Sequence, residues 1–434
     1  MQNTIYRLPF SKSTIEFNLP HRMQGTLALS QPAGPVKDEP GAIRAALAHP
    51  IRSVPLCDLA SRGMRVCIVF TDSTRASPDH LLVPALLSEL KKAGVLDEDI
   101  TLLCGIGMHR PSTHEEKISK LGAEVVARYR VIDNEPQNPA ALVDLGITPD
   151  GVPILLHRAV VETDLLIATG IVEPHQYAGY SGGSKTVGVG AAGEALIAYT
   201  HGPAFLDHPG TRLGRVEGNP FQEAVKESAR RVHLRFILNV VLDDDKRILR
   251  VAAGDPDQAF QDLVRFARSV YEVPIPHQYD IAIGGVGFPK DCNLYQASRA
   301  PSYLFFAPTA VVRPGGFFII PARCEEGAGA GVGERRFLAA MSAAPNVQHI
   351  LEDARRNGYP PGQQRAFVMA KVLEQTRVVI VGSECPDLVT ACKMVPAASM
   401  EEALDLAAKE LGPACSVLVV PHALLTLPIV QAGT

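Results

Sequence analysis

The sequence lacks several features that would place it in a specialised class of protein. It has no run of basic residues, and its net charge of −4 argues against an electrostatic nucleic-acid binder. Its eight cysteines form no C-x-x-C pair, which favours free thiols in a reducing compartment over a disulfide framework or a zinc ribbon. The first residues, MQNTIYRLPFSKSTIEF, contain no apolar segment of the signal-peptide type. We therefore expect a cytoplasmic protein that binds neither nucleic acid nor a membrane.

What the sequence does contain is typical of a large globular protein. It has 434 residues, of which 46% are hydrophobic and 20% are charged, a balance too apolar for intrinsic disorder. A single hydrophobic core rarely serves a chain of this length, so we expect two domains. The longest uncharged segment, CSVLVVPHALLTLPIVQAGT, contains two prolines and a histidine, which favours a strand, a turn and a tail over a membrane span.

Three strand-like segments in the N-terminal half are each followed by a polar loop. MRVCIVF (64–70), DITLLCGIG (99–107) and TDLLIATGIV (163–172) are short and apolar, and the first two loops lead into helical patterns. This alternation predicts a parallel α/β sheet whose loops gather at the carboxyl ends of the strands. Such sheets usually bind ligands at that edge.

A segment with two prolines and no periodicity, YEVPIPHQYD (271–280), predicts a linker. A second strand–helix series follows it, with YDIAIGGVG, GGFFIIPA, RVVIVGSE and CSVLVVPH as strands. We therefore predict an α/β fold of two α/β domains with parallel or mixed sheets. The N-terminal domain would span residues 1–272 and a Rossmann-like C-terminal domain residues 273–434, with the active site in the cleft between them.

The segment GYSGGSKT (179–186) is one residue short of a phosphate-binding P-loop, because Ser184 stands where that motif has its second glycine. A P-loop must also follow a buried strand directly, and here the apolar segment ends well before Gly179. We therefore do not expect a nucleotide-hydrolysing site. The overlapping GVGAAG (188–193) also lacks a preceding strand, which favours a small-residue helix packed closely against its neighbours.

Three of the thirteen histidines lie in loops near the ends of predicted strands: His109, His175 and His201. A single loop histidine is usually solvated and inert. Three of them, flanked by glycine and proline residues that fix the backbone, indicate either proton transfer near neutral pH or metal binding. Their spacing is not that of a zinc finger or an H-E-x-x-H helix, so a zinc site built only from protein ligands is not expected.

Five segments together resemble the motif series of the nickel-pincer-nucleotide lactate racemase family. They are DSTR (72–75), GMHR (107–110), EPHQYAGYSGGSK (173–185), THGP (200–203) and NLYQASR (293–299), in that family's order and spacing. The resemblance implies a cofactor, the nickel-pincer nucleotide (nickel pyridinium-3,5-bisthiocarboxylic acid mononucleotide), covalently attached at Lys185. It also implies that His201 is the protein's ligand to nickel. The near P-loop would then be an attachment loop in which Gly182 and Gly183 allow close backbone approach.

The resemblance implies a racemase or epimerase of a 2-hydroxycarboxylic acid such as lactate or malate. The reaction would be a reversible, proton-coupled hydride transfer to the tethered cofactor, with the N-terminal domain as the cofactor-binding and catalytic one. Each enantiomer needs a base for its hydroxyl proton, and His109 and His175 would supply the pair. The cofactor would carry the hydride chemistry while the protein positions and protonates the substrate.

By the resemblance, the loop DSTR lies on the side of the site that binds the cofactor. The candidate cofactor-binding residues are therefore Asp72, Ser73, Thr74 and Arg75. Asp72 would order the loop and contact the cofactor. Arg75 would also bind the substrate, because its planar guanidinium group can hold a carboxylate at two points. The alternative interpretation is that Arg75 is a structural cap on this loop.

In the segment NLYQASR, Tyr295 and Gln296 match substrate-side residues of the family. Arg299 stands where the lactate enzyme has lysine. The positive charge is kept, but its reach and geometry change, so the substrate need not be lactate itself.

The expected partners are the small 2-hydroxyacid substrate and the cofactor-biosynthesis proteins needed for maturation. Two other interpretations remain open at this point. The first is a nicotinamide-dependent oxidoreductase that uses the C-terminal domain, although IAIGGVGFP is a poor match to the dinucleotide fingerprint. The second is a non-catalytic carrier of the pincer cofactor, which would explain Lys185 and His201 but not the pair His109 and His175.

Overall fold

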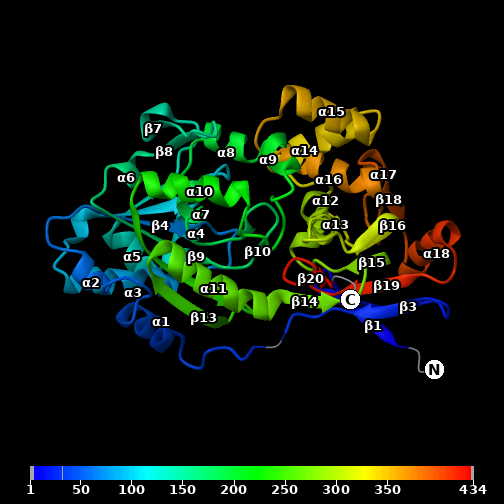
Figure 1. Ribbon diagram of the computed structural model, residues 1–434, viewed down its shortest axis with the longest axis horizontal. Coiled ribbons are helices and arrows are strands. Elements are labelled where there is room, and N and C mark those ends of the chain that lie inside the picture. The colour runs from blue at the N-terminus through cyan, green and yellow to red at the C-terminus, as the bar shows by residue number, and fades with distance from the viewer. Residues whose placement is uncertain (1–3, 32, 432–434) are drawn as a thin grey trace. The chain divides into compact units, whose positions relative to one another are not determined.

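The computed structural model describes residues 4–31 and 33–431 and divides the chain into two compact units (Figure 1). What we call the C-terminal unit contains the segment up to Gln31, Gly202–Arg215 and the segment from Tyr271 onward. The N-terminal unit contains the intervening residues up to His201, and Val216–Val270. The sequence predicted two continuous domains, 1–272 and 273–434, and the structure differs because two segments of the first part pack with the second.

The N-terminal unit is built on a mixed sheet. Its strands, in spatial order, are β13 (Ile248–Gly254), β12 (Leu234–Leu242), β9 (Leu165–Ile171), β4 (Val66–Thr71), β5 (Ile100–Gly105) and β6 (Arg130–Asp133). Every neighbouring pair is parallel except β12 and β13, which are antiparallel. The three predicted strands are confirmed as β4, β5 and β9, and they lie side by side in the sheet.

Helices cover both faces of this sheet. Helices α1 (Glu39–Ala48), α2 (Leu56–Leu59) and α3 (Asp79–Lys92) pack on one face, and α7 (Lys185–Gly188) and α10 (Pro220–Arg231) on the other (Figure 1). The remaining elements are η1 (Asp97–Asp99), α4 (His114–Leu121), α5 (Ala123–Arg128), η2 (Pro139–Ala141), β7 (Leu142–Ile147), β8 (Pro153–His157), α6 (Arg158–Val161), β10 (Pro174–His175), β11 (Gly179–Tyr180), α8 (Glu194–Thr200) and α11 (Pro256–Tyr271).

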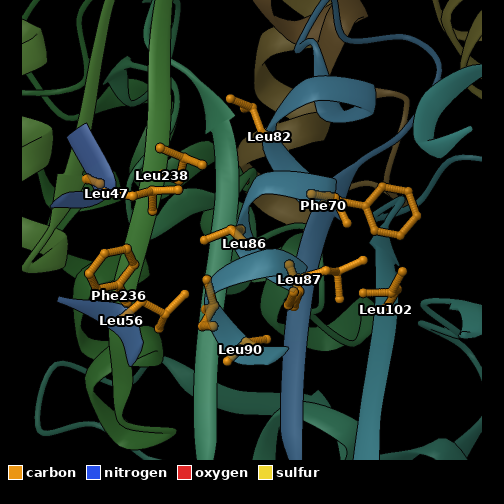
Figure 2. Close-up of a cluster of buried hydrophobic side chains, with 14 of the residues drawn as sticks. Leu47, Leu56, Phe70, Leu82, Leu86, Leu87, Leu90, Leu102, Phe236 and Leu238 are labelled. Atoms are coloured by element: carbon orange, nitrogen blue, oxygen red, sulfur yellow. The ribbon is translucent and has the colours of Figure 1, made fainter. Parts of the chain in front are cut away.

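The core under α3 explains why this helix forms and where it lies. Leu82, Leu86 and Leu90 recur every four residues, so they share one helical face, and each is fully buried. They pack against side chains of the strands, including Phe236 and Leu238 of β12 (Figure 2). Burying each leucine contributes about 1.5–3 kcal/mol. This packing fixes the strands whose loops carry the candidate site.

The C-terminal unit is built on a fully parallel sheet. Its strands, in spatial order, are β18 (Val395–Ala397), β17 (Arg377–Val381), β16 (Val312–Pro321), β15 (Tyr279–Gly284), β19 (Ser416–Val420) and β3 (Gln24–Leu27). The chain runs outward from β15 through β16 and β17, then crosses back to β19. That reversal makes the unit Rossmann-like, as predicted.

The other elements of this unit are mostly helices. They are β1 (Ile5–Phe10), β2 (Ser13–Asn18), α9 (Pro203–Asp207), β14 (Glu272–Ile275), η3 (Lys290–Cys292), α12 (Leu294–Ala297), α13 (Arg299–Phe305), α14 (Val332–Ala343), α15 (Val347–Asn357), α16 (Gln364–Gln375), α17 (Pro386–Ala391), α18 (Met400–Leu411) and β20 (Leu427–Val430).

Two segments from the first half of the chain, residues 4–31 and 202–215, belong to the C-terminal unit for clear physical reasons. Strand β3 pairs in parallel with β19, and Leu8 and Phe17 of the β1–β2 hairpin are buried in the core of this sheet. In the segment 202–215, the Asp207 carboxylate binds Lys371 at 2.6 Å and Arg355 at 2.9 Å. Hydrogen bonds and buried apolar area therefore hold both segments here.

The predicted linker is also more ordered than expected. Residues 272–275 form β14, which pairs in parallel with β20 near the C-terminus. The final segment, interpreted as a strand, a turn and a tail, thus contains a second strand. Within residues 4–31 and 33–431, the structure contains no helix long and apolar enough to span a membrane.

Candidate active site

Three of the predicted site loops meet at one edge of the N-terminal sheet. The strands β9, β4 and β5 are neighbours, and the loops after them carry His175, Asp72 and His109 respectively. The chain runs from β4 outward to β5 on one side and returns to β9 on the other. In open α/β sheets a ligand crevice forms at such a reversal, at the carboxyl ends of the strands.

Asp72 and His109 form a hydrogen-bonded pair. The Nδ1 atom of His109 lies 2.5 Å from Oδ2 of Asp72, while Oδ1 of Asp72 accepts bonds from the backbone N–H and hydroxyl of Thr74 at 3.0 and 2.6 Å. Burial raises the pKa of the Asp72 carboxyl, but the bonds to His109 and Thr74 and the charge of Arg75 together lower its pKa to about 2. The carboxylate is therefore ionised at neutral pH.

This pairing decides which nitrogen of His109 is reactive. An ionised carboxylate only accepts hydrogen bonds. The Nδ1 atom of His109 therefore carries a hydrogen and donates a hydrogen bond to Asp72. In the neutral ring, Nε2 then carries the lone pair. About half of the His109 side chain is exposed (49%), so Nε2 can be reached from solvent. The arrangement is that of an oriented general base.

A buried ion pair supports the loop that carries Asp72. The Asp79 carboxylate is fully buried and binds Lys120 of α4 at 2.8 Å. It also accepts bonds from the hydroxyls of Thr71 and Thr169. Lys120 in turn donates to the Arg75 carbonyl at 3.2 Å, so the ion pair reaches the backbone of the loop. Sequence reasoning missed both charged residues, since nothing in their local pattern marks them as buried partners.

The other residues of the loop have these positions. Ser73 and Thr74 are exposed, and their hydroxyls bond to Glu116 and Asp72 respectively. Arg75 is half-buried, and its backbone N–H donates to the Asp72 carbonyl. These bonds close the turn that follows β4.

His175 lies on a short hairpin that follows β9. It pairs with Gly179 across β10 and β11, and its ring is buried. Its Nδ1 atom accepts hydrogen bonds from the backbone N–H groups of Tyr177 and Ala178, each at 3.2 Å. Because Nδ1 is the acceptor, Nε2 of the neutral ring carries the proton. His175 and His109 thus present opposite tautomers.

His201, the predicted metal ligand, is the C-cap residue of helix α8. Its Nδ1 donates to the Ile197 carbonyl at 2.9 Å, which leaves the lone pair on Nε2. Burial lowers the pKa of His201, and the nearby positive charge of Lys185 lowers it further, to about 4, against the opposing effect of the bond to Ile197. The ring is therefore neutral at physiological pH, as metal binding requires.

Aromatic contacts connect His201 with His175. The ring of Tyr177 stands edge-on to both, with centroids 5.5 Å from His201 and 5.8 Å from His175. Phe221 contacts His201 at 5.0 Å and His175 at 6.3 Å. Asn219 fixes this cluster, because it caps α10 and its Nδ2 donates to the Tyr177 carbonyl at 2.7 Å. Sequence reasoning also missed these packing residues.

The loop before Lys185, which the sequence predicted to be an attachment loop, is shaped by its glycines. Gly182 has φ of +83°, and a Cβ atom there would lie 2.8 Å from the Ile171 carbonyl oxygen, so no other residue fits without strain. The N–H of Gly183 donates to the buried Asn239 side chain at 2.7 Å. Lys185 then begins α7 and is half-buried. The loop thus holds Lys185 by backbone contacts.

The structure explains both glycine-rich matches. Strand β9 ends at Ile171, and only the two-residue strand β11, which is itself the start of GYSGGSKT, precedes the glycines, so no strand of the main sheet leads directly into this loop. Gly188 packs on Val225 of α10, where an added Cβ would lie 2.9 Å from the Val225 Cα. An added Cβ on Gly190 would lie 3.0 Å from the Cα of Gly105. These glycines permit close packing, as predicted, but the predicted helix over 188–193 is wrong, because α7 ends at Gly188 and a turn follows it.

The remaining predicted residues lie together in the C-terminal unit. Tyr295 and Gln296 are on α12, and the Arg299 side chain at the start of α13 donates to Gln296 Oε1 at 3.3 Å. The guanidinium of buried Arg365 lies 5.7 Å from the centre of the Tyr295 ring and donates to the Ser302 hydroxyl at 2.9 Å. All three predicted residues are half-buried. Sequence reasoning missed Arg365, which is distant in the chain.

Potential metal ligands are sparse. In the described part of the chain, no group of three or more His, Cys, Asp or Glu side chains is arranged to hold a metal ion.

Comparison with known proteins places this arrangement in a family. A model of the lactate racemase N-terminal domain matches residues 10–214, and one of the lactate racemase C-terminal domain matches residues 276–427. Over 421 residues, the chain is 32% identical to a lactate racemase of Lactiplantibacillus plantarum, covering 96% of this chain and 98% of that one. Over 419 residues, it is 30% identical to a lactate racemase of Thermoanaerobacterium thermosaccharolyticum, covering 95% and 96%.

Solved structures agree. The lactate racemase apoprotein from T. thermosaccharolyticum superposes with a TM-score of 0.87 at 28% identity, covering 98% of this chain and 100% of that one. A Thermotoga maritima protein shares the fold with a TM-score of 0.68 at 19% identity, covering 92% of this chain and 100% of that one. The protein is thus a two-unit α/β protein of known architecture. It belongs to the lactate racemase family, as the sequence motifs predicted.

Proposed function

We propose that this protein racemises a small 2-hydroxycarboxylic acid with a nickel-pincer nucleotide held at Lys185 and His201. The observation that supports it most directly is the pair of opposite histidine tautomers. His109 presents a lone pair at Nε2, and His175 presents an Nε2–H group. Inverting a carbinol carbon through a flat keto acid needs one histidine that accepts the hydroxyl proton as the neutral ring and one that donates a proton as the imidazolium.

The residues fit the implied cofactor. The charge of Lys185 acts on His201, so the proposed attachment point and the proposed metal ligand are near each other. His201 is neutral and is held by the Ile197 carbonyl, the support that ligating histidines usually have. A single imidazole is enough if the cofactor itself supplies the other ligands in a square-planar geometry, which nickel accepts.

When bound, the nickel-pincer nucleotide supplies the hydride chemistry that amino-acid side chains lack. The chain's own groups bind the substrate and move its proton. His109 takes the hydroxyl proton at Nε2, and the Asp72 carboxylate stabilises the imidazolium that results. Arg75 lies beside this pair and offers a two-point contact to the substrate carboxylate.

His175 must also change its proton state during a full cycle. For Nε2 of His175 to accept a proton, Nδ1 must carry one, and Nδ1 then cannot accept from Tyr177 and Ala178. Tyr177 and Ala178 are buried, so their N–H groups must find other acceptors when these bonds are released. We infer that the hairpin tip shifts when His175 acts as a base.

The direct test is a racemisation assay on protein produced in a host that makes the cofactor. Intact-mass measurement should show an adduct with the mass of a mononucleotide derivative and one nickel per chain. Either enantiomer of the substrate should yield the racemic mixture without added nicotinamide. Loaded protein that is inactive on a panel of 2-hydroxyacids would favour the carrier interpretation.

His201→Ala should lower nickel content and activity together, because it removes the protein ligand that we assign to the metal. Nickel per chain measured by elemental analysis should fall at least several-fold. His208→Ala is the matched control, since His208 is exposed and its Nδ1 bonds only to the backbone N–H of Gly210 among the contacts described. Equal nickel content in the two variants would remove His201 from the metal site.

Arg299→Lys should change the relative rates among 2-hydroxyacids. A guanidinium group can make planar, two-point contacts, whereas an ammonium group is a compact point charge. We expect a dicarboxylic substrate such as malate to lose rate relative to lactate, by roughly tenfold for one lost hydrogen bond to a charged group. Arg323→Lys is the control, because Arg323 is bound to Glu384 elsewhere in the unit. Identical substrate profiles would show that Arg299 does not contact the substrate.

The nicotinamide interpretation receives no support from the glycines after β15. A Cβ atom at Gly285 would lie 2.3 Å from the Pro421 carbonyl oxygen, and one at Gly287 would lie 2.9 Å from the Pro9 side chain. These glycines therefore serve packing within the unit. A 3₁₀ turn and the four-residue α12 follow, where a dinucleotide site needs a helix directly after the strand.

A further inference from the structure

Helix α4 reaches both loops that carry the Asp72–His109 pair. The Arg110 guanidinium, next to His109, donates to both carboxylate oxygens of Glu116, at 2.8 and 2.6 Å. The hydroxyl of Ser73, next to Asp72, donates to Glu116 Oε1 at 3.2 Å. One carboxylate thus binds the immediate chain neighbours of both members of the pair.

The position of Glu116 is itself well fixed. Its Oε2 accepts from the backbone N–H of Thr113 at 2.8 Å, and its own N–H donates to the Thr113 hydroxyl at 3.2 Å, which is a capping box. The two-point bond to Arg110 has the geometry in which arginine–carboxylate pairs are strongest. Arg110 is the main cause of the low pKa of Glu116, about 2, with the Thr113 bond second.

The next turn of the same helix supports the same loop. Lys120 is four residues after Glu116, so both side chains project from one face of α4. Lys120 donates to the Ser77 carbonyl at 2.9 Å and the Thr71 hydroxyl at 3.0 Å. Helix α4 therefore contacts the loop after β4 at three points, which are Thr71 at the start of the loop, Ser73 at its tip and Ser77 near its end.

We propose that Glu116 is a positioning residue that aligns His109 with Asp72 for proton transfer. The inference rests on the proposed function for its consequence in catalysis, but the alignment is a property of the cofactor-free chain. Lys120 fixes the base of the Asp72 loop, whereas Glu116 binds the residues directly beside Asp72 and His109, so its loss frees the tips of both loops. A base displaced by about 1 Å can lose 10²-fold in rate.

The first measurement uses cofactor-free protein labelled with ¹⁵N-histidine. The Nδ1–H proton of His109, bonded to a carboxylate, should give a downfield, slowly exchanging resonance, identified by its loss in His109→Gln. Glu116→Ala should broaden it or shift it upfield, and Glu116→Gln, which keeps one acceptor oxygen, should have a smaller effect. An unchanged resonance in Glu116→Ala overturns the proposal.

Two matched variants separate alignment from helix stability. Thr113→Ala removes the N-cap hydroxyl, at a cost of about 1 kcal/mol, but leaves the contacts of Glu116 with Ser73 and Arg110. Glu115→Ala removes the neighbouring exposed carboxylate from the same helical turn. Both should keep the resonance. If Thr113→Ala weakened the resonance as much as Glu116→Ala does, Glu116 would act only through the helix terminus.

The second measurement uses loaded protein. Glu116→Ala should lower kcat roughly 10-fold to 100-fold with little change in KM, because the base is displaced while the substrate contacts remain. Glu115→Ala should retain the wild-type kcat. If the resonance responds to Glu116→Ala but the wild-type protein has no racemase activity, the alignment is upheld and the proposed function is rejected. If the protein is active and Glu116→Ala leaves kcat unchanged, a role for Glu116 in catalysis is rejected.

Discussion

Lys185→Ala is expected to abolish both the covalent adduct and racemisation. The adduct requires the lysine amine, and no other side chain is proposed to hold the cofactor covalently. The fold should survive, because Lys185 is half-buried in a loop fixed by its glycines and by the bond from Gly183 to Asn239. We expect the stability to change by no more than about 0.5 kcal/mol. Intact mass, circular dichroism and the racemisation assay measure the three quantities.

Two further variants isolate the role of the amine. Lys185→Arg keeps the positive charge but has no primary amine, so it should also lack the adduct. Lys226→Ala removes another half-buried lysine of the same unit and should keep both adduct and activity. Full activity in Lys185→Ala would reject the covalent cofactor.

Cofactor-free protein offers an independent check on the position of Lys185. Its charge lowers the pKa of His201, after the larger effect of burial. Removing that charge makes protonation of His201 easier, so the pKa should rise from about 4 towards the ordinary value in Lys185→Ala and stay low in Lys185→Arg. An NMR titration of the His201 ring measures this. An identical pKa in both variants would show that Lys185 lies farther from His201 than we infer.

The features that were predicted correctly are those that depend on local sequence patterns. The apolar segments at 64–70, 99–107 and 163–172 became β4, β5 and β9 because short β-rich segments flanked by polar loops have few alternatives. The motif loops then had to lie at one edge of the sheet, since parallel strands have their carboxyl ends together. The approximate place of His109 and His175 followed from this.

Features that depend on distant parts of the chain were not predictable in this way. Strand β3 belongs to the C-terminal sheet only because β19, almost 400 residues later, pairs with it. The strand β14 was taken for a linker because its partner β20 also lies far along the chain, with Glu272 paired to Leu427. The charged side chains that support the site loops could not be predicted for the same reason. Lys120 and Glu116 are ordinary helix residues in sequence, and only the tertiary fold gives them the Arg75 carbonyl and the Ser73 hydroxyl as partners.

His109→Ala and His175→Ala should each impair racemisation in both directions, by roughly 10²–10⁴-fold, the range for a lost general acid–base group. In the proposed mechanism, each enantiomer loses its hydroxyl proton to one histidine, and the product receives a proton from the other. The equilibrium constant of racemisation is one, so kcat/KM must fall equally in the two directions. His114→Ala is the control, because His114 is exposed at the start of α4.

A half-reaction should distinguish the two variants. With His175 absent, the enantiomer whose hydroxyl faces His109 can still be deprotonated and converted to the keto acid in a single turnover, and with His109 absent the other enantiomer can. Because His109 is already oriented by Asp72, whereas His175 must first release Tyr177 and Ala178, the half-reaction should be faster in His175→Ala. Rapid quench with each pure enantiomer, followed by keto-acid detection, measures both rates. If both variants racemise at near wild-type rates, the two histidines are ordinary loop residues and the proposed mechanism is wrong.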